Sequence, residues 1–357
     1  MPELSAAAIG LAPQPSSAGP AVSAGWAVRV TAPARLSFTL ISLDAESQRR
    51  NGIAAFAVDK PSTTVEVRAA EQLDFRLGRL AEDTAVELVQ GVRLLQQHWA
   101  GPPVRIEIPA ALPEHSGFGS KTTTLLAAGY AYGMFCGQTP DLRELAGVFG
   151  RGRTSGASTG LAELGGFLVD GGHRNPAGFR SAPQSYLRPS RFARPAAPPT
   201  PTIRLPFPPW PILVMLTAGR QLSGAAELDW FRSVTPIPPA ESWRAAHLVL
   251  MGLAPAVAEA DYDGFCAAVN EITFTGHFKR AQIAVQGPAL AALLQSARDS
   301  SVIDAIALSV TGPACFAFSR QPAAAAEWAT RLRAAGQLTD FWFTTANNHG
   351  LSAMFVP

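Results

Sequence analysis

The chain has 357 residues, a formal net charge of +2 and an apolar fraction of 47%, which is ordinary for a globular protein. So small a net charge creates no broad field that would attract nucleic acid or an acidic membrane, and we expect neither as a partner. The length predicts two domains and a core that needs no disulfides.

Targeting signals are absent from the pattern of the sequence. No uninterrupted apolar run approaches the roughly 18 residues that span a bilayer. The first ten residues contain Glu3 and lack the basic region of a signal peptide. The three cysteines, Cys136, Cys266 and Cys315, form no CxxC pair and are odd in number. These features favour a cytoplasmic protein with reduced thiols.

Residues 1–24 are rich in Ala, Pro, Ser and Gly without periodicity, which predicts a disordered tail. A first domain is expected over residues 25–205. Alternating and helical spacings of apolar residues predict its elements. The strands are expected over 27–35, where the strand ends at Pro33, and over 53–58, 63–67, 104–108 and 165–170, and the helices over 84–99, 122–135 and 142–150.

Residues 175–211 are dense in proline, and we interpret them as a connection between domains. A loop of this length can also cover an active site. A second domain is expected over residues 206–357, with mixed order of helices and strands, as in α+β proteins. Its strands are expected over 212–216, 303–310, 315–319 and 341–344, and its helices over 242–258, 263–272, 288–300 and 323–335.

A glycine-rich loop, Pro113 to Thr122, stands between a predicted strand and a predicted helix. Its glycines let the backbone approach an anion, and free amides at the helix start favour phosphate. Lys121 adds a point charge and is one of only three lysines in the chain. The GxxxxGK spacing of a Walker A motif is missing, and a tight turn is the alternative. The residues expected to bind a diphosphate are His115, Ser116, Gly117, Phe118, Gly119, Ser120, Lys121 and Thr122.

A second loop, Gly150 to Gly160, combines glycines, hydroxyls and two arginines before another helical stretch. Such a loop suits a second phosphate group and a closely fitting sugar, and a flexible loop with solvated arginines is the alternative. The residues expected to bind the ribose phosphate are Gly152, Arg153, Thr154, Ser155 and Gly156.

These two loops, together with Pro33-Ala34-Arg35 and a turn at Val310 to Cys315, resemble the GHMP kinase superfamily in order and spacing. The resemblance covers nearly the whole chain from about residue 26. It implies an α+β fold with a ribosomal S5 domain 2-like N-terminal domain and a ferredoxin-like C-terminal domain, facing each other across a cleft. The superfamily often forms dimers, so the resemblance is compatible with a homodimer, but the sequence does not decide the oligomeric state.

One branch of the superfamily fits better, the β-ribofuranosylaminobenzene 5'-phosphate synthases, which use phosphoribosyl diphosphate instead of ATP. Within this branch, the C-glycosynthases of C-nucleoside antibiotic pathways, such as formycin and pyrazofurin, are a divergent group. The residues that carry the resemblance to the branch are Pro33 to Leu40, Asn51-Gly52-Ile53, Gly150-Arg151-Gly152, Thr154-Ser155-Gly156, Glu163, Gly165-Gly166-Phe167, Val169 to His173, Leu222-Ser223-Gly224 and Glu227.

The chain departs from the family pattern at three places. Ser158 stands where many kinases of the superfamily have an aspartate as general base, and a serine is no anionic base at neutral pH. The phosphate loop has Phe118 and Lys121 where the branch commonly has leucine and glycine. Ser37 stands where the branch commonly has histidine. The last two departures argue against the usual acceptor, a para-substituted benzoate.

The sequence therefore predicts a decarboxylating C-ribosyltransferase in C-nucleoside biosynthesis. It would join phosphoribosyl diphosphate to a ring carbon of an aromatic carboxylate, 4-amino-pyrazole-3,5-dicarboxylate, with loss of CO₂ and diphosphate. Three alternatives stay open. They are a synthase of methanopterin synthesis acting on 4-amino- or 4-hydroxybenzoate, an ATP-dependent small-molecule kinase, and a non-catalytic phosphosugar sensor.

Lys121, Arg35 and Arg153 are the expected catalytic residues, because the leaving diphosphate and the acceptor carboxylates need cations. Mg²⁺ is the expected cofactor, with Ser120, Glu114 and Glu163 as ligands and Asp170 as a further acid to consider. Arg49, Arg50 and Lys279 are further candidates for the acceptor, although Arg49 and Arg50 also fit a solvated turn. The acceptor-binding residues are expected to be Arg35, Ser37, Thr39, Asn51, Arg220 and Ser223.

Overall fold

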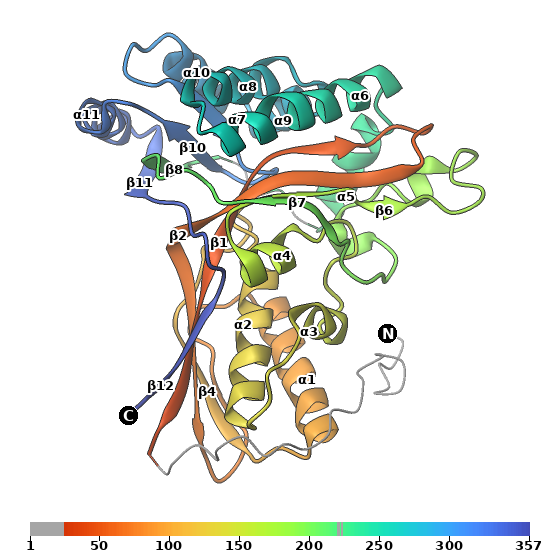
Figure 1. Ribbon diagram of the computed structural model, residues 1–357, viewed down its shortest axis with the longest axis vertical. Helices are drawn as coiled ribbons and strands as arrows, with labels where there is room; N and C mark the ends of the chain where they lie inside the picture. The colour runs from red at the N-terminus through yellow and green to blue at the C-terminus, as the bar shows by residue number, and fades with distance from the viewer. Residues whose placement is uncertain (1–24, 220–221, 223) are drawn as a thin grey trace.

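The computed structural model describes residues 25–219, 222 and 224–357, and within them two sheets each carry helices (Figure 1). The predicted disordered tail over residues 1–24 lies outside the described residues, as do Arg220 and Ser223. Among the described helices, none has both the length and the apolar character that crossing a bilayer requires.

The first sheet has eight strands in the described part of the chain, and its main path runs in the order β12-β1-β2-β4-β3. β5 and β6 pair with β2, and β7 pairs with β5. The strands are β1 (Ala27–Ser42), β2 (Arg49–Ala69), β3 (Asp74–Arg76), β4 (Val104–Ala110), β5 (Phe167–Asp170), β6 (His173–Arg174), β7 (Pro201–Leu205) and β12 (Ser352–Val356).

β1 and β2 are longer than the sequence predicts. The expected end of β1 at Pro33 is wrong, because Pro33 stands at a register shift opposite Ser62, where the ladder tolerates the missing N–H. The two short strands predicted over 53–58 and 63–67 are parts of the single strand β2. The resulting antiparallel ribbon runs through both halves of the molecule (Figure 1).

Four helices accompany the first sheet: α1 (Glu82–Trp99), α2 (Ser120–Phe135), α3 (Leu142–Val148) and α4 (Ala157–Leu164). α2 packs on β1 and β2 and contacts the other three helices. Most of its residues are buried, which explains why it is apolar on all sides. α2 therefore fixes the end of the glycine-rich loop that precedes it.

The second sheet is antiparallel and has the order β11-β8-β10-β9. A series of helices connects β8 to β9, and the single helix α11 (Pro322–Ala334) connects β10 to β11. This βαββαβ connection with the first and last strands side by side is the ferredoxin-like arrangement. It confirms the predicted α+β fold class. The strands are β8 (Ile212–Thr217), β9 (Ala305–Leu308), β10 (Ala314–Phe318) and β11 (Leu338–Thr344).

The connection from β8 to β9 holds more helices than predicted, because α5 and α9 were not expected. α6, the π-helical η4 and α7 follow one another without a break and cover the predicted helix over 242–258. The helices are α5 (Gly224–Val234), α6 (Pro239–His247), η4 (Leu248–Leu253), α7 (Ala254–Glu259), α8 (Tyr262–Thr275), α9 (His277–Gln286) and α10 (Pro288–Arg298). The proline-rich connection contains β7 and two 3₁₀ turns, η2 (Pro183–Ser185) and η3 (Ser190–Phe192).

An aromatic core joins the two sheets. The rings of Phe38 and Phe56, from β1 and β2, stack with centroids 5.1 Å apart, and the Phe316 ring from β10 lies 5.3 Å from that of Phe56. The expected domain boundary between residues 205 and 206 falls between β7, in the first sheet, and β8, in the second. β12 returns to the first sheet beside β1. Shared packing of this kind holds the two halves in one relative position.

Candidate active site

The loop between β4 and α2 turns through three residues in the left-handed region. His115, Gly117 and Gly119 have φ of 55°, 98° and 71°. Gly119 precedes α2, and no side chain caps the first turn of that helix. Free amides at a helix start, together with the helix dipole, bind anions. The loop therefore has the backbone geometry of a phosphate site.

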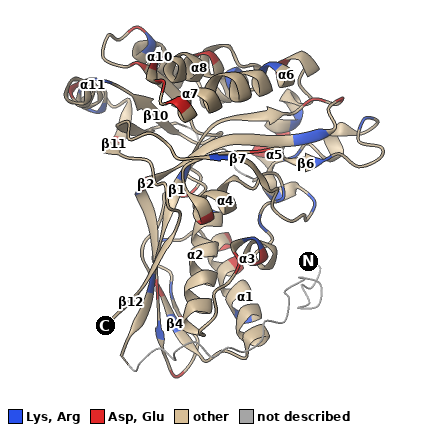
Figure 2. Ribbon diagram, viewed as in Figure 1, with Lys and Arg blue, Asp and Glu red and all other residues tan. Residues whose placement is uncertain are grey.

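A cavity of about 350 Å³ lies against this loop and is lined from both halves of the chain. Among its described lining residues, six are Lys or Arg and three are Asp or Glu: Arg35, Lys121, Arg151, Arg153, Arg188 and Arg191, against Asp83, Glu87 and Glu227. Elsewhere the charges are dispersed over both halves (Figure 2). An excess of guanidinium groups around a cavity favours a polyanionic ligand.

Six of the eight residues predicted to bind diphosphate line the cavity, namely His115, Gly117, Gly119, Ser120, Lys121 and Thr122. The other two are turned away. The Ser116 carbonyl oxygen accepts a hydrogen bond of 3.1 Å from Ala314 N, and the Phe118 side chain is fully buried in the core. These two residues support the loop on the side away from the cavity.

Lys121 enters the cavity as part of a charge cluster. Its Nζ lies 2.9 Å from Asp83 Oδ2 and 2.8 Å from Glu87 Oε1, both on α1. Arg151 joins the cluster, because its Nε donates a 3.0 Å hydrogen bond to Thr122 Oγ1 and its Nη1 lies 3.9 Å from Glu87 Oε2. Burial lowers the pKa of Arg151, and the Glu87 carboxylate opposes this. An incoming anion would share these cations with the two carboxylates.

Arg35 presents its guanidinium to the cavity. Its Nε is buried and has no hydrogen-bond partner among the described residues. Burial lowers the pKa of Arg35 to about 10, and the Asp170 carboxylate partly offsets this, so the group is still charged at neutral pH. A buried guanidinium without a partner is costly unless a ligand supplies one.

The second glycine loop is held by Asp170, whose carboxylate accepts hydrogen bonds from Gly156 N at 2.9 Å and Gly172 N at 2.8 Å. Burial raises the pKa of Asp170 to about 6. Both of its oxygens serve the backbone, so it is not free to act as a metal ligand. An ideal Cβ on Gly156 would overlap Pro199 O in the proline-rich connection, so Gly156 has a packing role. The remaining residues predicted to bind the ribose phosphate line the cavity, namely Gly152, Arg153, Thr154 and Ser155.

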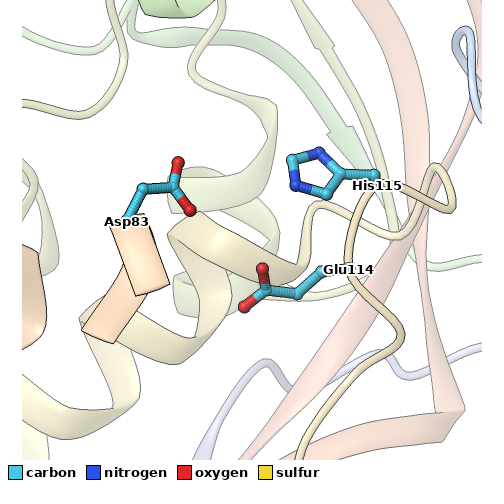
Figure 3. Close-up of side chains that lie close together, drawn as sticks. All are labelled: Asp83, Glu114 and His115. Atoms are coloured by element: carbon cyan, nitrogen blue, oxygen red, sulfur yellow. The ribbon is translucent and has the colours of Figure 1, made fainter. Parts of the chain in front are cut away.

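Asp83, Glu114 and His115 converge beside the phosphate loop (Figure 3), with one ligand atom of each within 4.8 Å of the others. Glu114 Oε1 is buried without a hydrogen-bond partner among the described residues, and Ser120 lines the adjoining cavity. Carboxylate and hydroxyl oxygens are ligands that suit Mg²⁺. These residues therefore fit a divalent cation. Glu163 is exposed on α4 and does not line the cavity, so it is not placed to share an ion with Glu114.

The residues predicted to bind the acceptor divide into three groups. Arg35 and Asn51 line the cavity. Ser37 and Thr39 do not: Ser37 Oγ accepts a 3.2 Å hydrogen bond from Val310 N, and Thr39 Oγ1 donates to Leu40 O at 2.8 Å. Arg220 and Ser223 lie outside the described residues.

The additional cations proposed for the acceptor have structural partners. Arg49 donates to Gly171 O and Gly172 O at 2.7 and 2.6 Å. Arg50 donates to Arg174 O at 2.9 Å, which joins β2 to the segment at β6. Lys279 is buried, and its Nζ donates to Leu308 O at 2.8 Å. All three lie outside the lining of the cavity, so the structure does not bring them together with the predicted site residues there.

Two parts of the cavity were not predicted as site residues. The proline-rich connection contributes four residues from Arg188 to Arg191, so it covers the site as well as linking the sheets. α5 and α9 contribute apolar and polar side chains. Apart from Gly224 and Glu227, which belonged to motifs, no sequence signal marks them, because neither helix was expected. These residues are Gly224, Glu227, Phe231, Phe278 and Gln282.

Comparison with known structures supports the fold. A homoserine kinase from Cytophaga hutchinsonii superimposes with a TM-score of 0.62 at 17% identity, covering 96% of this chain and all of that one. The phosphomevalonate kinase of Streptococcus pneumoniae superimposes with a TM-score of 0.61 at 11% identity, covering 88% of this chain and 98% of that one. At such identities the likeness concerns the fold alone.

Comparison with known sequences identifies the branch. Residues 253–338 match the model of the C-terminal domain of GHMP kinases. A β-ribofuranosylphenol 5'-phosphate synthase from Archaeoglobus fulgidus is 32% identical over 85% of this chain and 91% of its own length. The protein of the same name from Methanothermobacter thermautotrophicus is 31% identical over 80% of this chain and 87% of its own length. The chain therefore belongs to the β-ribofuranosylphenol 5'-phosphate synthase branch of the GHMP kinase superfamily.

Proposed function

We propose that this protein transfers the ribose 5-phosphate of phosphoribosyl diphosphate to the ring carbon that bears the carboxylate of a 4-substituted benzoate. The bond between the anomeric carbon and the diphosphate oxygen breaks, and the leaving diphosphate takes its electron pair. A carbon–carbon bond forms, and the carboxylate leaves as CO₂, returning an electron pair to the ring. Because CO₂ departs in place of a proton, the reacting carbon needs no strong base.

The observation that carries the proposal is the lining of one cavity by two glycine loops with an excess of cations. A donor with phosphoryl groups at both ends needs two such loops. The first loop offers backbone amides and Lys121, and the second offers Arg153, Thr154 and Ser155. Amides and cations fixed near the leaving group stabilise the charge that develops as the bond breaks.

The acceptor is assigned from the relatives. Their name describes a ribosylated phenol phosphate, and this favours 4-hydroxybenzoate or 4-aminobenzoate over the aminopyrazole dicarboxylate that the sequence first favoured. Arg35 lines the same cavity, and its Nε has no hydrogen-bond partner among the described residues, which suits the acceptor carboxylate. A carboxylate bound beside the phosphate loop would lie close to the donor, where positioning contributes much of the rate.

A divalent cation belongs to the proposal as well. Asp83, Glu114, His115 and Ser120 would hold it, and when bound it would neutralise part of the charge of the diphosphate. The Nζ of Lys121 contacts the carboxylates of both Glu87 and Asp83. With the cation bound, Lys121 would retain its ion pair with Glu87, and Asp83 would interact with both Lys121 and the cation.

Phosphotransfer from ATP has less support. Ser158 lines the cavity at the position where the kinases have their aspartate, and a neutral hydroxyl cannot serve as an anionic base.

Incubation of the purified protein with phosphoribosyl diphosphate, Mg²⁺ and one acceptor at a time tests the proposal. We expect equal amounts of CO₂ and diphosphate with 4-hydroxybenzoate or 4-aminobenzoate. Product from 4-amino-pyrazole-3,5-dicarboxylate alone would return the acceptor to the C-nucleoside class. Consumption of ATP with homoserine, mevalonate or galactose would overturn the proposal, as would tight donor binding without turnover on any acceptor.

A further inference from the structure

The cavity has an apolar wall on the side of α5 and α9. Phe231 and Phe278 contact each other, with ring centroids 5.7 Å apart, and belong to one hydrophobic cluster against which Leu40 packs. Leu40 also packs against the cluster that contains Ile53, its partner across the β1–β2 ladder. Leu40, Ile53, Phe231 and Phe278 all line the cavity. A wall of this kind suits a flat apolar ring.

The same cavity is lined by two residues that each have a buried polar atom without a partner in the described part of the chain. Asn51 stands two residues before Ile53 on β2, and both residues line the cavity. Asn51 is 2% exposed, and its Nδ2 has no hydrogen-bond partner among the described residues. Gln282 stands one helical turn after Phe278 on α9, is 1% exposed, and its Oε1 likewise has no partner among them.

Buried amide groups in native proteins are nearly always paired, so an unpaired donor and an unpaired acceptor in one cavity point to a ligand. The ligand must present an acceptor to Asn51 and a donor to Gln282. An ionised carboxylate only accepts hydrogen bonds, whereas a hydroxyl or amino group donates one.

We propose that Asn51 and Gln282 determine the acceptor specificity, Asn51 Nδ2 by donating to the ring carboxylate and Gln282 Oε1 by accepting from the hydroxyl or amino group at the opposite end of the ring. This inference rests on the proposed function for the identity of the ring. It adds that the site selects rings with a hydrogen-bond donor opposite the carboxylate. The accepted hydrogen bond also increases electron density at the ring carbon para to the donor group, which is the carbon that attacks.

A binding cycle of two proteins and two ligands tests the assignment without requiring turnover. 4-Fluorobenzoate matches 4-hydroxybenzoate closely in size but cannot donate. We expect Gln282→Leu to lower the affinity for 4-hydroxybenzoate at least tenfold, the loss typical of a buried hydrogen bond. The affinity for 4-fluorobenzoate should stay unchanged. Gln295→Leu is the matched control, because Gln295 is exposed on the neighbouring helix α10. Equal effects of Gln282→Leu on both ligands would overturn the assignment.

Asn51→Asp keeps the size of the side chain and replaces the donor with a like charge. Aspartate tolerates the left-handed backbone of this position, where φ is 64°. We expect the KM for the benzoate to rise more than tenfold while the KM for phosphoribosyl diphosphate changes little. An unchanged benzoate KM would overturn the role of Asn51.

Two outcomes separate this inference from the proposed function. If the wild-type protein forms no product but binds 4-hydroxybenzoate at least tenfold more tightly than 4-fluorobenzoate, the assignment of the acceptor-binding residues is supported and the proposed reaction is wrong. If Gln282→Leu does not fold, the affinities of the wild-type protein for the two ligands test the assignment instead. Equal affinities would overturn it.

Discussion

Ser309 Oγ donates a hydrogen bond of 2.8 Å to the carbonyl oxygen of Gly117, so the turn between β9 and β10 is tied to the phosphate loop. The same hydroxyl accepts a hydrogen bond from Ser37 N at 3.2 Å. These contacts join β1, the phosphate loop and the second sheet at one point. The position of the loop therefore depends on the ferredoxin-like half as much as on α2.

Gly312 offers a direct test of this dependence. An ideal Cβ on Gly312 would overlap Ser116 C and Gly117 N, so Gly312→Ala should displace the loop. Because displacement of about 1 Å can cost about a hundredfold in rate, we expect kcat/KM for phosphoribosyl diphosphate to fall by about that factor. Gly147→Ala on α3 is the control, since nothing lies within 4 Å of its Cβ. Equal activity of the two variants would contradict the dependence.

Ser158 and Arg35 are neighbours, because an ideal Cβ on Gly119 would lie 2.7 Å from Ser158 Oγ and 3.1 Å from Arg35 Nε. Ser158→Asp should create an ion pair with the unpaired guanidinium and thereby remove it from the substrate. We expect the KM for the substrate bound by Arg35 to rise by a factor on the order of ten or more. Ser158→Ala, which adds no charge, should stay close to the wild type in the same assay. If Ser158→Asp retains the wild-type KM for both substrates, Arg35 does not bind an anionic substrate group.

Much of the site could be predicted from the sequence because the glycine loops are local. Positive φ at Gly117 and Gly119, and free amides before α2, follow from a few adjacent residues. The fold class followed from the resemblance that those loops carry. Lys121 lines the cavity together with the rest of its loop, but its ion pairs with Asp83 and Glu87 join residues distant in sequence, and no pattern indicated them.

The part of the acceptor side that α9 contributes could not be predicted, because this helix shows no hydrophobic periodicity. Its buried residues are Phe278, Lys279, Gln282 and Gln286, and only the first is apolar. A helix with a polar buried face shows no hydrophobic repeat. The strand end expected at Pro33 failed for a different reason, since the register shift that accommodates this proline depends on the partner strand β2.

Lys279 should affect stability without binding a substrate. Burial lowers its pKa to about 7, below the ordinary value of 10.5. Between these values the unfolded chain binds more protons, so the free energy of unfolding rises with pH from about 7 towards 10. Lys279→Met has no titrating group at this position and lacks this rise. The free energy of unfolding of the wild type should therefore increase relative to that of Lys279→Met by on the order of 3 kcal/mol from pH 6 to pH 9. Urea unfolding at both pH values measures the difference, and a constant difference would contradict the buried charge.

Glu227 should make the free energy of unfolding depend on pH in the sense opposite to that of Lys279. Burial raises its pKa to about 7, and Arg191 opposes this rise. The folded chain therefore binds more protons than the unfolded chain between about pH 4.5 and 7. The resulting contribution to stability is complete below pH 4.5 and is lost as the pH rises through 7. Glu227→Gln should lack this loss when the free energy of unfolding is measured at pH 5 and pH 8.

The same ionisation places a further negative charge in the cavity above pH 7. The wild-type protein should therefore bind phosphoribosyl diphosphate more weakly than Glu227→Gln at pH 8, by a factor on the order of ten, and about equally at pH 6. Using the ratio of the two dissociation constants removes the titration of the donor itself. Asp229→Asn on the same helix is the control, because its side chain is 76% exposed. A ratio that does not change with pH, or one that Asp229→Asn reproduces, would mean that Glu227 does not act on the bound donor.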